Sequence, residues 1–119
     1  MINVNEQRVD MDVAEAADAY ALGSPDYFSY VAGGLKQFFD DILIAKNAGK
    51  KTAEKPCVLF LTHGGGGKAV ESLERLANSQ KLVKAAETLS IKGAPEAKRD
   101  VEKSIALGKA LAEHVVGAK

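Results

Sequence analysis

The sequence predicts an α/β protein in which a mostly parallel sheet lies between two layers of helices. Strand-like and helix-like segments alternate along its 119 residues, and apolar side chains recur at helical spacing in the longer segments. In addition, the apolar run 57–61 passes into four consecutive glycines, Gly64 to Gly67, and then into a helical pattern. The length suits a single domain over residues 1–119, with about four strands and three main helices in a three-layer arrangement.

The first half of the chain is expected to supply two strands and one long helix. Residues 2–11 alternate weakly between apolar and polar side chains, which predicts an edge strand. An acidic connection at 12–18, with about one helical turn, leads to a compact buried strand at 19–22. The sequence Gly-Ser-Pro-Asp at 23–26 is typical of a turn and predicts the end of that strand. A clear helical pattern then covers 31–46.

The second half is expected to begin with a polar, lysine-rich loop and the buried strand at 57–61. A second helix follows the glycines and ends near Ser79, and an alternating edge strand covers 84–91. Gly93-Ala94-Pro95 predicts a turn before a long last helix, since Pro95 suits a first helical position and Glu96 favours a helix start. By their spacing, six residues line one face of this helix: Val101, Ile105, Gly108, Leu111, Ala112 and Val115.

The composition excludes several classes of function. Sixteen basic residues balance sixteen acidic ones, so we expect neither a nucleic-acid partner nor an anionic membrane partner. No apolar stretch approaches the ~20 residues of a membrane span, and no signal peptide pattern is seen. The single cysteine, Cys57, excludes an internal disulfide and favours a reducing, cytoplasmic location. No cluster of His, Cys and carboxylates has the spacing of a metal site.

Two loops are the strongest candidates for a binding site. The loops 23–30 and 62–67 follow strands expected to be neighbours, and ligands of parallel sheets bind beyond the carboxyl ends of such strands. Glycines allow backbone N–H groups to approach a ligand, and a helix N-terminus adds partial positive charge. Tyr27 is expected to stack on a ligand or to pack, whereas Phe28 is expected to pack against the next helix. Dinucleotide-binding and Walker patterns fit the glycine run poorly, and no hydrolase motif occurs.

The first loop and the helix after it resemble those of a known family. Gly-Ser-Pro-Asp-Tyr-Phe at 23–28, followed by Gly-Leu-Lys-Gln-Phe-Phe-Asp at 34–40, resembles the third strand, flavin loop and third helix of flavodoxin-like proteins. These include flavodoxins and the FMN-dependent NAD(P)H:quinone and flavin reductases. The segment 55–67 is similar to their fourth strand and second flavin loop, and 93–95 with 107–112 to their last helix.

This resemblance implies an FMN whose isoalloxazine ring lies between the two loops. Backbone groups of the loops would contact the ring edge, Tyr27 or Phe28 would cover one face, and His63 would lie by the ring or at the pocket mouth. An alternative for His63 is a hydrogen bond to backbone or solvent. The implied function is electron transfer or NAD(P)H:quinone or flavin reduction with a redox partner protein, and the chemistry would be that of the cofactor. The implied contacts are Ser24, Pro25, Asp26, Tyr27, Phe28, Thr62, His63, Gly64, Gly65 and Gly66.

One departure from the family pattern has two consequences. The family opens with a strand and a Ser/Thr-x-Thr-Gly-x-Thr loop that holds the FMN phosphate, and this chain has no Thr-Gly or Ser-Gly pair. FMN binding is therefore expected to be weak or lost, and the alternative is a flavodoxin-like module that binds no flavin and serves as a structural or partner-binding subunit. The absent strand would be central in the sheet, so 19–22 should have an unpaired side. We expect a homodimer or a strand-exchanged oligomer.

Overall fold

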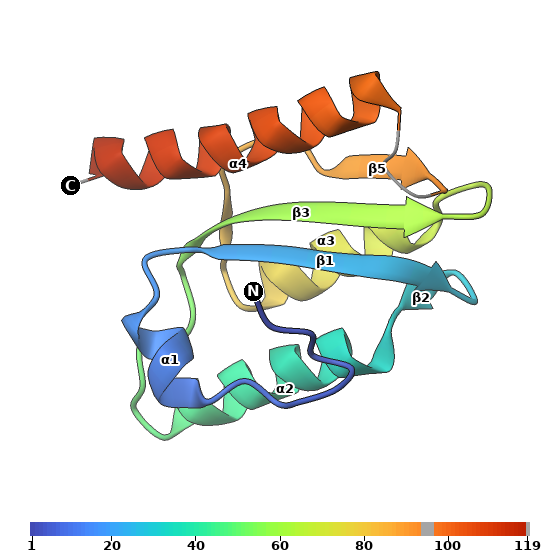
Figure 1. The fold of residues 1–119 in the computed structure, drawn as a ribbon. Coiled ribbons are helices and arrows are strands. Elements are labelled where there is room, and N and C mark those ends of the chain that lie inside the picture. Colours follow the sequence, from blue (N-terminus) through green and yellow to red (C-terminus); the bar gives the residue numbers. More distant parts are fainter. Residues whose placement is uncertain (94–96, 119) are drawn as a thin grey trace.

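The computed structural model describes residues 1–93 and 97–118, with the backbone alone for residue 118 (Figure 1). Helices and strands alternate as the sequence predicts, and no described helix has the length and apolar character to cross a membrane. In chain order the elements are α1 (Met11–Ala16), β1 (Tyr20–Tyr27), β2 (Tyr30–Val31), α2 (Gly33–Asn47), β3 (Pro56–His63), α3 (Ala69–Ser79), β4 (Val83–Lys84), β5 (Leu89–Lys92) and α4 (Lys98–Ala118).

The sheet is built around the parallel pair of β1 and β3. Their register runs from Tyr20 opposite Cys57 to Pro25 opposite Thr62. β4 and β5 both lie parallel to β3 along its other edge, and the short β2 turns back antiparallel to the end of β1. The sheet is therefore mostly parallel, and the ends of β1 and β3 lie side by side.

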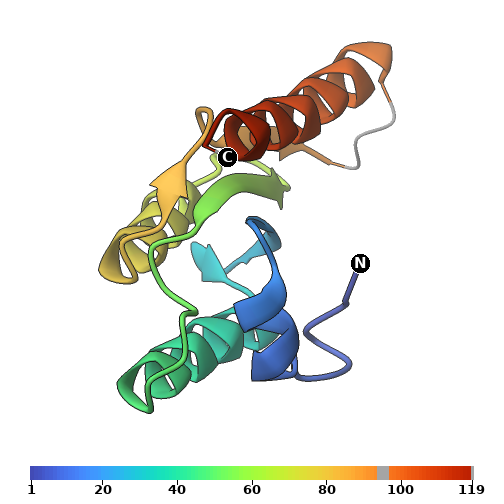
Figure 2. The same cartoon turned by 90° about the vertical axis from the view of Figure 1, so that its left-hand side faces the viewer.

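Two layers of helices enclose this sheet, so the domain has three layers. α4 lies over one face, and α1, α2 and α3 cover the other (Figures 1 and 2). Side chains of β3 are buried on both faces, as expected for a central strand, which explains the continuous apolar run there. The core on the three-helix side contains, among others, Leu22, Phe38, Phe39, Ile42, Leu59 and Leu73.

The predicted helices at 31–46 and after the glycines are confirmed as α2 and α3. α2 ends because Gly49 takes a φ of 100°, a conformation that favours glycine. The N–H groups of Gly49 and Lys50 then donate to the carbonyls of Lys46 and Ala45, at 3.0 and 2.9 Å. These bonds satisfy carbonyl groups that the last turn of the helix would otherwise leave unpaired.

The predicted edge strand at 2–11 is wrong. Residues 1–10 contain no strand, and the carbonyl of Asn3 accepts the N–H groups of Glu6 and Gln7 in a turn. Asp10 then caps α1, since its carboxylate accepts the N–H of Asp12 at 2.8 Å. Val4 and Val9 pack against the core from a loop and Met11 packs from the first turn of α1, so burial alone accounts for their spacing.

The strand predicted at 19–22 is longer than expected and continues through the Gly-Ser-Pro-Asp sequence. Its register with β3 holds these residues extended, so tertiary pairing overrides their turn propensity. Gly23 lies directly beneath the ring of Phe60, which would overlap a Cβ atom at that position. The glycine therefore provides close approach to a neighbouring strand instead of a turn.

The strand predicted at 84–91 is divided into β4 and β5, which share β3 as their neighbour. The turn expected at 93–95 and the helix start at Pro95 and Glu96 fall on residues 94–96, which lie outside the described residues. The structure describes the last helix from Lys98 onward.

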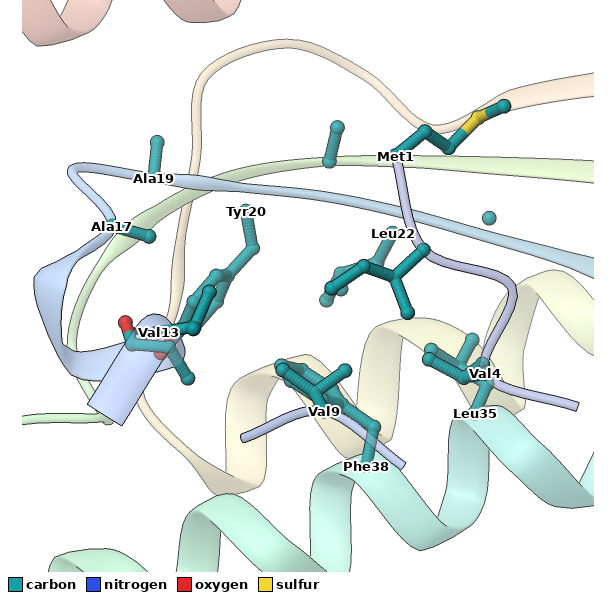
Figure 3. Close-up of a pocket in the computed structure, with 14 residues that line it drawn as sticks. Met1, Val4, Val9, Val13, Ala17, Ala19, Tyr20, Leu22, Leu35 and Phe38 are labelled. Carbon is teal, nitrogen blue, oxygen red and sulfur yellow. Dashed lines mark hydrogen bonds between the residues drawn. The ribbon is translucent and has the colours of Figure 1, made fainter. Parts of the chain in front are cut away.

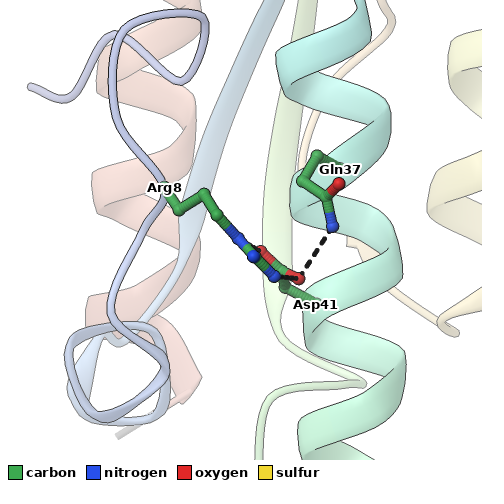
Figure 4. Close-up of polar contacts among 3 residues, drawn as sticks. All are labelled: Arg8, Gln37 and Asp41. Atoms are coloured by element: carbon green, nitrogen blue, oxygen red, sulfur yellow. Dashed lines mark hydrogen bonds and ion pairs between the residues drawn. The ribbon is translucent and has the colours of Figure 1, made fainter.

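A polar contact fixes the N-terminal segment to α2 (Figure 4). Arg8 donates to both carboxylate oxygens of Asp41, at 2.6 and 3.2 Å, and Gln37 donates to the same carboxylate at 3.0 Å. These bonds, that from Arg8 foremost, hold the pKa of Asp41 below its ordinary value, although the partial burial of the carboxylate acts in the opposite direction. The contact replaces the strand pairing that the sequence had predicted for this segment.

Replacing Asp41 with Asn is expected to lower the melting temperature at pH 7. Because the folded pKa of Asp41 lies below the unfolded value, the stabilisation is complete above the unfolded pKa of about 4. It is lost as the pH falls through the lower, folded pKa. Thermal melts of wild type and Asp41→Asn should therefore converge in acid, whereas Asp40→Asn, which removes a more exposed carboxylate, should change little at either pH. A difference between wild type and Asp41→Asn that persists unchanged at pH 2 would contradict this assignment.

Candidate functional site

A hollow of about 520 Å³ lies at the carboxyl ends of β1 and β3, between the two predicted loops. The parallel register creates it, because Pro25 and Thr62 are directly paired and the chain leaves the sheet after each strand. Six of the residues expected to contact a cofactor line the hollow together with Gly93; they are Pro25, Asp26, Tyr27, Thr62, His63 and Gly64.

One wall of the hollow is the hairpin between β1 and β2. Tyr27 pairs with Tyr30, and the two-residue loop between them, Phe28-Ser29, has φ angles of 53° and 63°. Two successive positive φ values are characteristic of a type I′ turn, which normally contains Asn and Gly. Non-glycine residues held in this way store backbone strain, and such strain concentrates at functional sites.

The aromatic side chains of this hairpin are open to solvent. Phe28 is fully exposed at the tip, so the expectation that it packs against the next helix is wrong. Tyr27 is more than half exposed while it lines the hollow, and Tyr30 is also exposed. An exposed aromatic group beside a hollow provides a flat apolar surface for a ligand.

Ser24 closes the base of the hairpin. Its hydroxyl is buried, accepts the N–H of Ala32 at 2.8 Å and donates to the carbonyl of Pro25 at 2.7 Å. The Ser24 hydroxyl is thus hydrogen-bonded to other groups of the protein, and its bond to Pro25 supports the position of that residue at the hollow.

The opposite wall is the glycine run. Gly64 lines the hollow, and Gly65 and Gly66 are exposed beyond it. No protein atom lies within 4 Å of the position of a Cβ at Gly64 or Gly65. Gly67 has a φ of 60°, and a Cβ there would lie 3.0 Å from Ser90 Oγ and 3.3 Å from His63 Nε2. The run therefore leaves backbone amides accessible on one side and makes a close turn against β5 on the other.

A carboxylate occupies the start of α3. Asp26 Oδ2 accepts the N–H of Ala69, the first residue of the helix, at 3.2 Å. This bond joins the end of β1 to the helix that follows the glycine run and stabilises the relative position of both walls. The positive end of the helix already faces this carboxylate, so an anionic ligand gains little attraction there.

His63 is the last residue of β3, and its Nδ1 is buried with no hydrogen-bond partner. A buried nitrogen without a partner is uncommon in a folded protein. The backbone carbonyl of His63 accepts the N–H of Gly93 at 2.7 Å. This bond brings the end of β5 to the hollow. Gly93 was not among the predicted contacts, although the rule that ligands bind beyond strand ends applies to β5 as much as to β1 and β3.

Among the described residues, the lining supplies aromatic, amide, hydroxyl, imidazole and carboxylate groups and contains no lysine or arginine. Cys57 is buried in the core, and burial raises the pKa of its thiol to about 11, so it offers no thiolate near neutral pH. Among residues 1–93 and 97–118, no group of His, Cys, Asp and Glu is placed to bind a metal ion. The groups present suit a flat, polar-edged ring more than a phosphate.

Comparison with known proteins agrees with this geometry. The family model of the NADPH-dependent FMN reductases matches residues 11–96. The chain belongs to this family. The matched segment contains both walls of the hollow and begins at α1. No match was found among curated proteins.

Solved structures show that this family member has the flavodoxin-like fold. A flavodoxin from the domain Archaea is 24% identical with a TM-score of 0.77, and the alignment covers 90% of this chain and 71% of that one. The flavodiiron core of Flv1 from Synechocystis sp. is 15% identical, also with a TM-score of 0.77, over 99% of this chain and 28% of that one. An NADPH-quinone reductase from P. pentosaceus is 19% identical with a TM-score of 0.55, over 99% and 75% of the two chains.

Replacing Ser29 with Gly is expected to stabilise the protein by about 1 kcal/mol, because glycine relieves the cost of a positive φ at this position. Urea unfolding measures the change. The control is Ser104→Gly in α4, where glycine should cost about 0.5–1 kcal/mol because it loses more entropy on joining a helix. Equal destabilisation by both substitutions would show that the hairpin is not strained.

Proposed function

We infer that this protein binds FMN between the β1–β2 hairpin and the glycine run, and that it transfers electrons as a flavodoxin-type carrier or an NAD(P)H:quinone or flavin reductase. The observation that carries this proposal is the hollow at the ends of β1 and β3, with exposed Tyr27 on one wall and accessible glycine amides on the other. Membership of the FMN reductase family supports the choice of flavin over other flat ligands.

The residues that would hold the ring come from three strand ends. Tyr27 would cover one face of the isoalloxazine, and Pro25 and Thr62 would form the floor. Backbone N–H groups of Gly64, Gly65 and Gly66 would donate to the polar edge of the ring. Phe28 would extend the aromatic wall from the tip of the hairpin.

FMN, when bound, supplies one- and two-electron redox chemistry. The protein's part is to orient the ring and to set the charge around it. Amide donors of the glycine run favour negative charge at the ring edge, whereas the carboxylate of Asp26 disfavours it. His63 lines the hollow and its Nδ1 has no hydrogen-bond partner, so this nitrogen could bond to the polar edge of the ring.

The phosphate of FMN has no evident place in this hollow. The part of the lining that the structure describes carries no lysine or arginine, and the start of α3 faces Asp26. We therefore expect affinity to depend on the ring, with a dissociation constant in the micromolar range or weaker. A module that binds no flavin is the second candidate, and the same missing phosphate contacts favour it.

A protein redox partner would approach the exposed aromatic hairpin, where electrons have a short path to the ring. The single buried cysteine supports a reducing, cytoplasmic setting for this exchange.

Titration of FMN, followed by quenching of flavin fluorescence, tests the proposal. Tyr27→Ala should weaken binding by roughly 3- to 10-fold, which corresponds to the loss of one aromatic contact of about 0.5–1.5 kcal/mol. Gly64→Val should abolish binding without unfolding the protein, since its side chain enters space that no protein atom occupies.

The matched control is Gly33→Val at the start of α2, where a Cβ also meets no protein atom within 4 Å. It should bind FMN like the wild type. Wild-type protein that fails to quench flavin fluorescence at millimolar FMN would support the second candidate function. Saturable binding that Tyr27→Ala and Gly64→Val leave unchanged would place the flavin elsewhere.

A further inference from the structure

The outer edge of β1 has no neighbouring strand over most of its length. Residues 20–25 pair with β3 on one side, whereas β2 pairs only with Asp26 and Tyr27. Within the described residues no strand pairs with the opposite side of 20–25. The outward backbone groups of this edge therefore have no strand partner, which favours the addition of another strand.

On the three-helix side, an apolar hollow of about 390 Å³ runs along the same edge (Figure 3). Tyr20 and Leu22 of β1 form one wall and Leu35 and Phe38 of α2 the floor, and the N-terminal segment lines another side. Met1, at its rim, is fully exposed. A strand added to β1 would close the open side of this hollow and bury apolar surface there.

On the α4 side, the sheet next to this edge is also incompletely covered. Ala21 and Phe60 are exposed, and together with Gly108 of α4 they line a second apolar hollow of about 310 Å³. Val101 and Ile105, which the sequence places on the same helical face as Gly108, remain exposed, Ile105 to 66%. Leu111 and Val115 of the same face are half-buried, so the single chain covers this apolar face only in part.

We propose that a second copy of this chain covers the free edge of β1, with the two β1 strands antiparallel about a two-fold axis. The edge from Tyr20 to Pro25 carries no charged side chain. A two-fold contact brings identical groups together, so it is favourable only for a surface that does not repel itself. The absence of net charge on the whole chain removes long-range repulsion between copies as well.

The direction of the two-fold axis determines which surfaces of the two copies contact each other in this dimer. An axis perpendicular to the sheet joins the two sheets into one and keeps both α4 helices on the same face. The exposed flanks of α4 then approach each other over Ala21 and Phe60, and the hollows beside β1 face each other on the opposite side. In the proposed dimer, this single two-fold contact covers the unpaired edge of β1 and the two incompletely covered faces beside it.

Light scattering coupled to size exclusion, over a range of protein concentrations, tests the proposal. The wild type should be a dimer, and Ala21→Lys and Ile105→Glu should each weaken dimerisation at least ~10-fold, since each places a charge at the contact. Ile44→Glu is the matched control, because Ile44 on α2 is 64% exposed and lies away from the edge. Circular dichroism and melting curves establish that the variants fold.

A cross-linking experiment tests the geometry independently. Ala21→Cys should form a disulfide-linked dimer under mild oxidation, whereas Ile44→Cys should not, and the buried Cys57 should not react in either. Wild-type protein that is monomeric at all concentrations would overturn the proposal. A dimer that both charged variants leave intact would overturn it too, and neither result depends on flavin binding.

Discussion

The parallel ladder between β1 and β3 is the constraint on which the rest of this structure depends. It holds Gly23, Ser24 and Pro25 extended although their sequence favours a turn, and it pairs Pro25 with Thr62. Because the register ends there, the hairpin and the glycine run leave the sheet as neighbours and enclose a common hollow. The same pairing uses only one side of β1 and leaves the other side open.

The sequence was sufficient where local pattern and tertiary environment agree. The apolar run at 57–61 became a central strand buried on both faces, and α2 and α3 have the predicted bounds to within a few residues. The sequence was insufficient where a residue type is compatible with two different local structures. Gly23 looked like a turn residue but allows the ring of Phe60 to approach, and Val4 and Val9 looked like strand residues but pack from a loop. Such contacts depend on partners distant in the sequence, which periodicity does not reveal.

The candidate site was predictable in its location and less so in its chemistry. Six of the expected residues line one hollow, because the rule about strand ends depends only on topology. The helix start after the glycines was expected to attract an anion, yet the structure places Asp26 there. That carboxylate comes from the other loop, more than forty residues earlier in the chain, so the pairing follows from the fold and not from either motif. The strained turn at Phe28 and Ser29 was also invisible in the sequence, since neither residue type favours a positive φ.

We propose that the hollow recognises the flavin ring and offers little to the phosphate. Titration of the wild-type protein with FMN and with riboflavin, which lacks the phosphate, tests this most directly. We expect dissociation constants that agree to within about threefold, a difference of about 0.7 kcal/mol. FMN that binds a hundredfold more tightly than riboflavin would contradict it, and would require a phosphate site that the hollow between the hairpin and the glycine run does not contain.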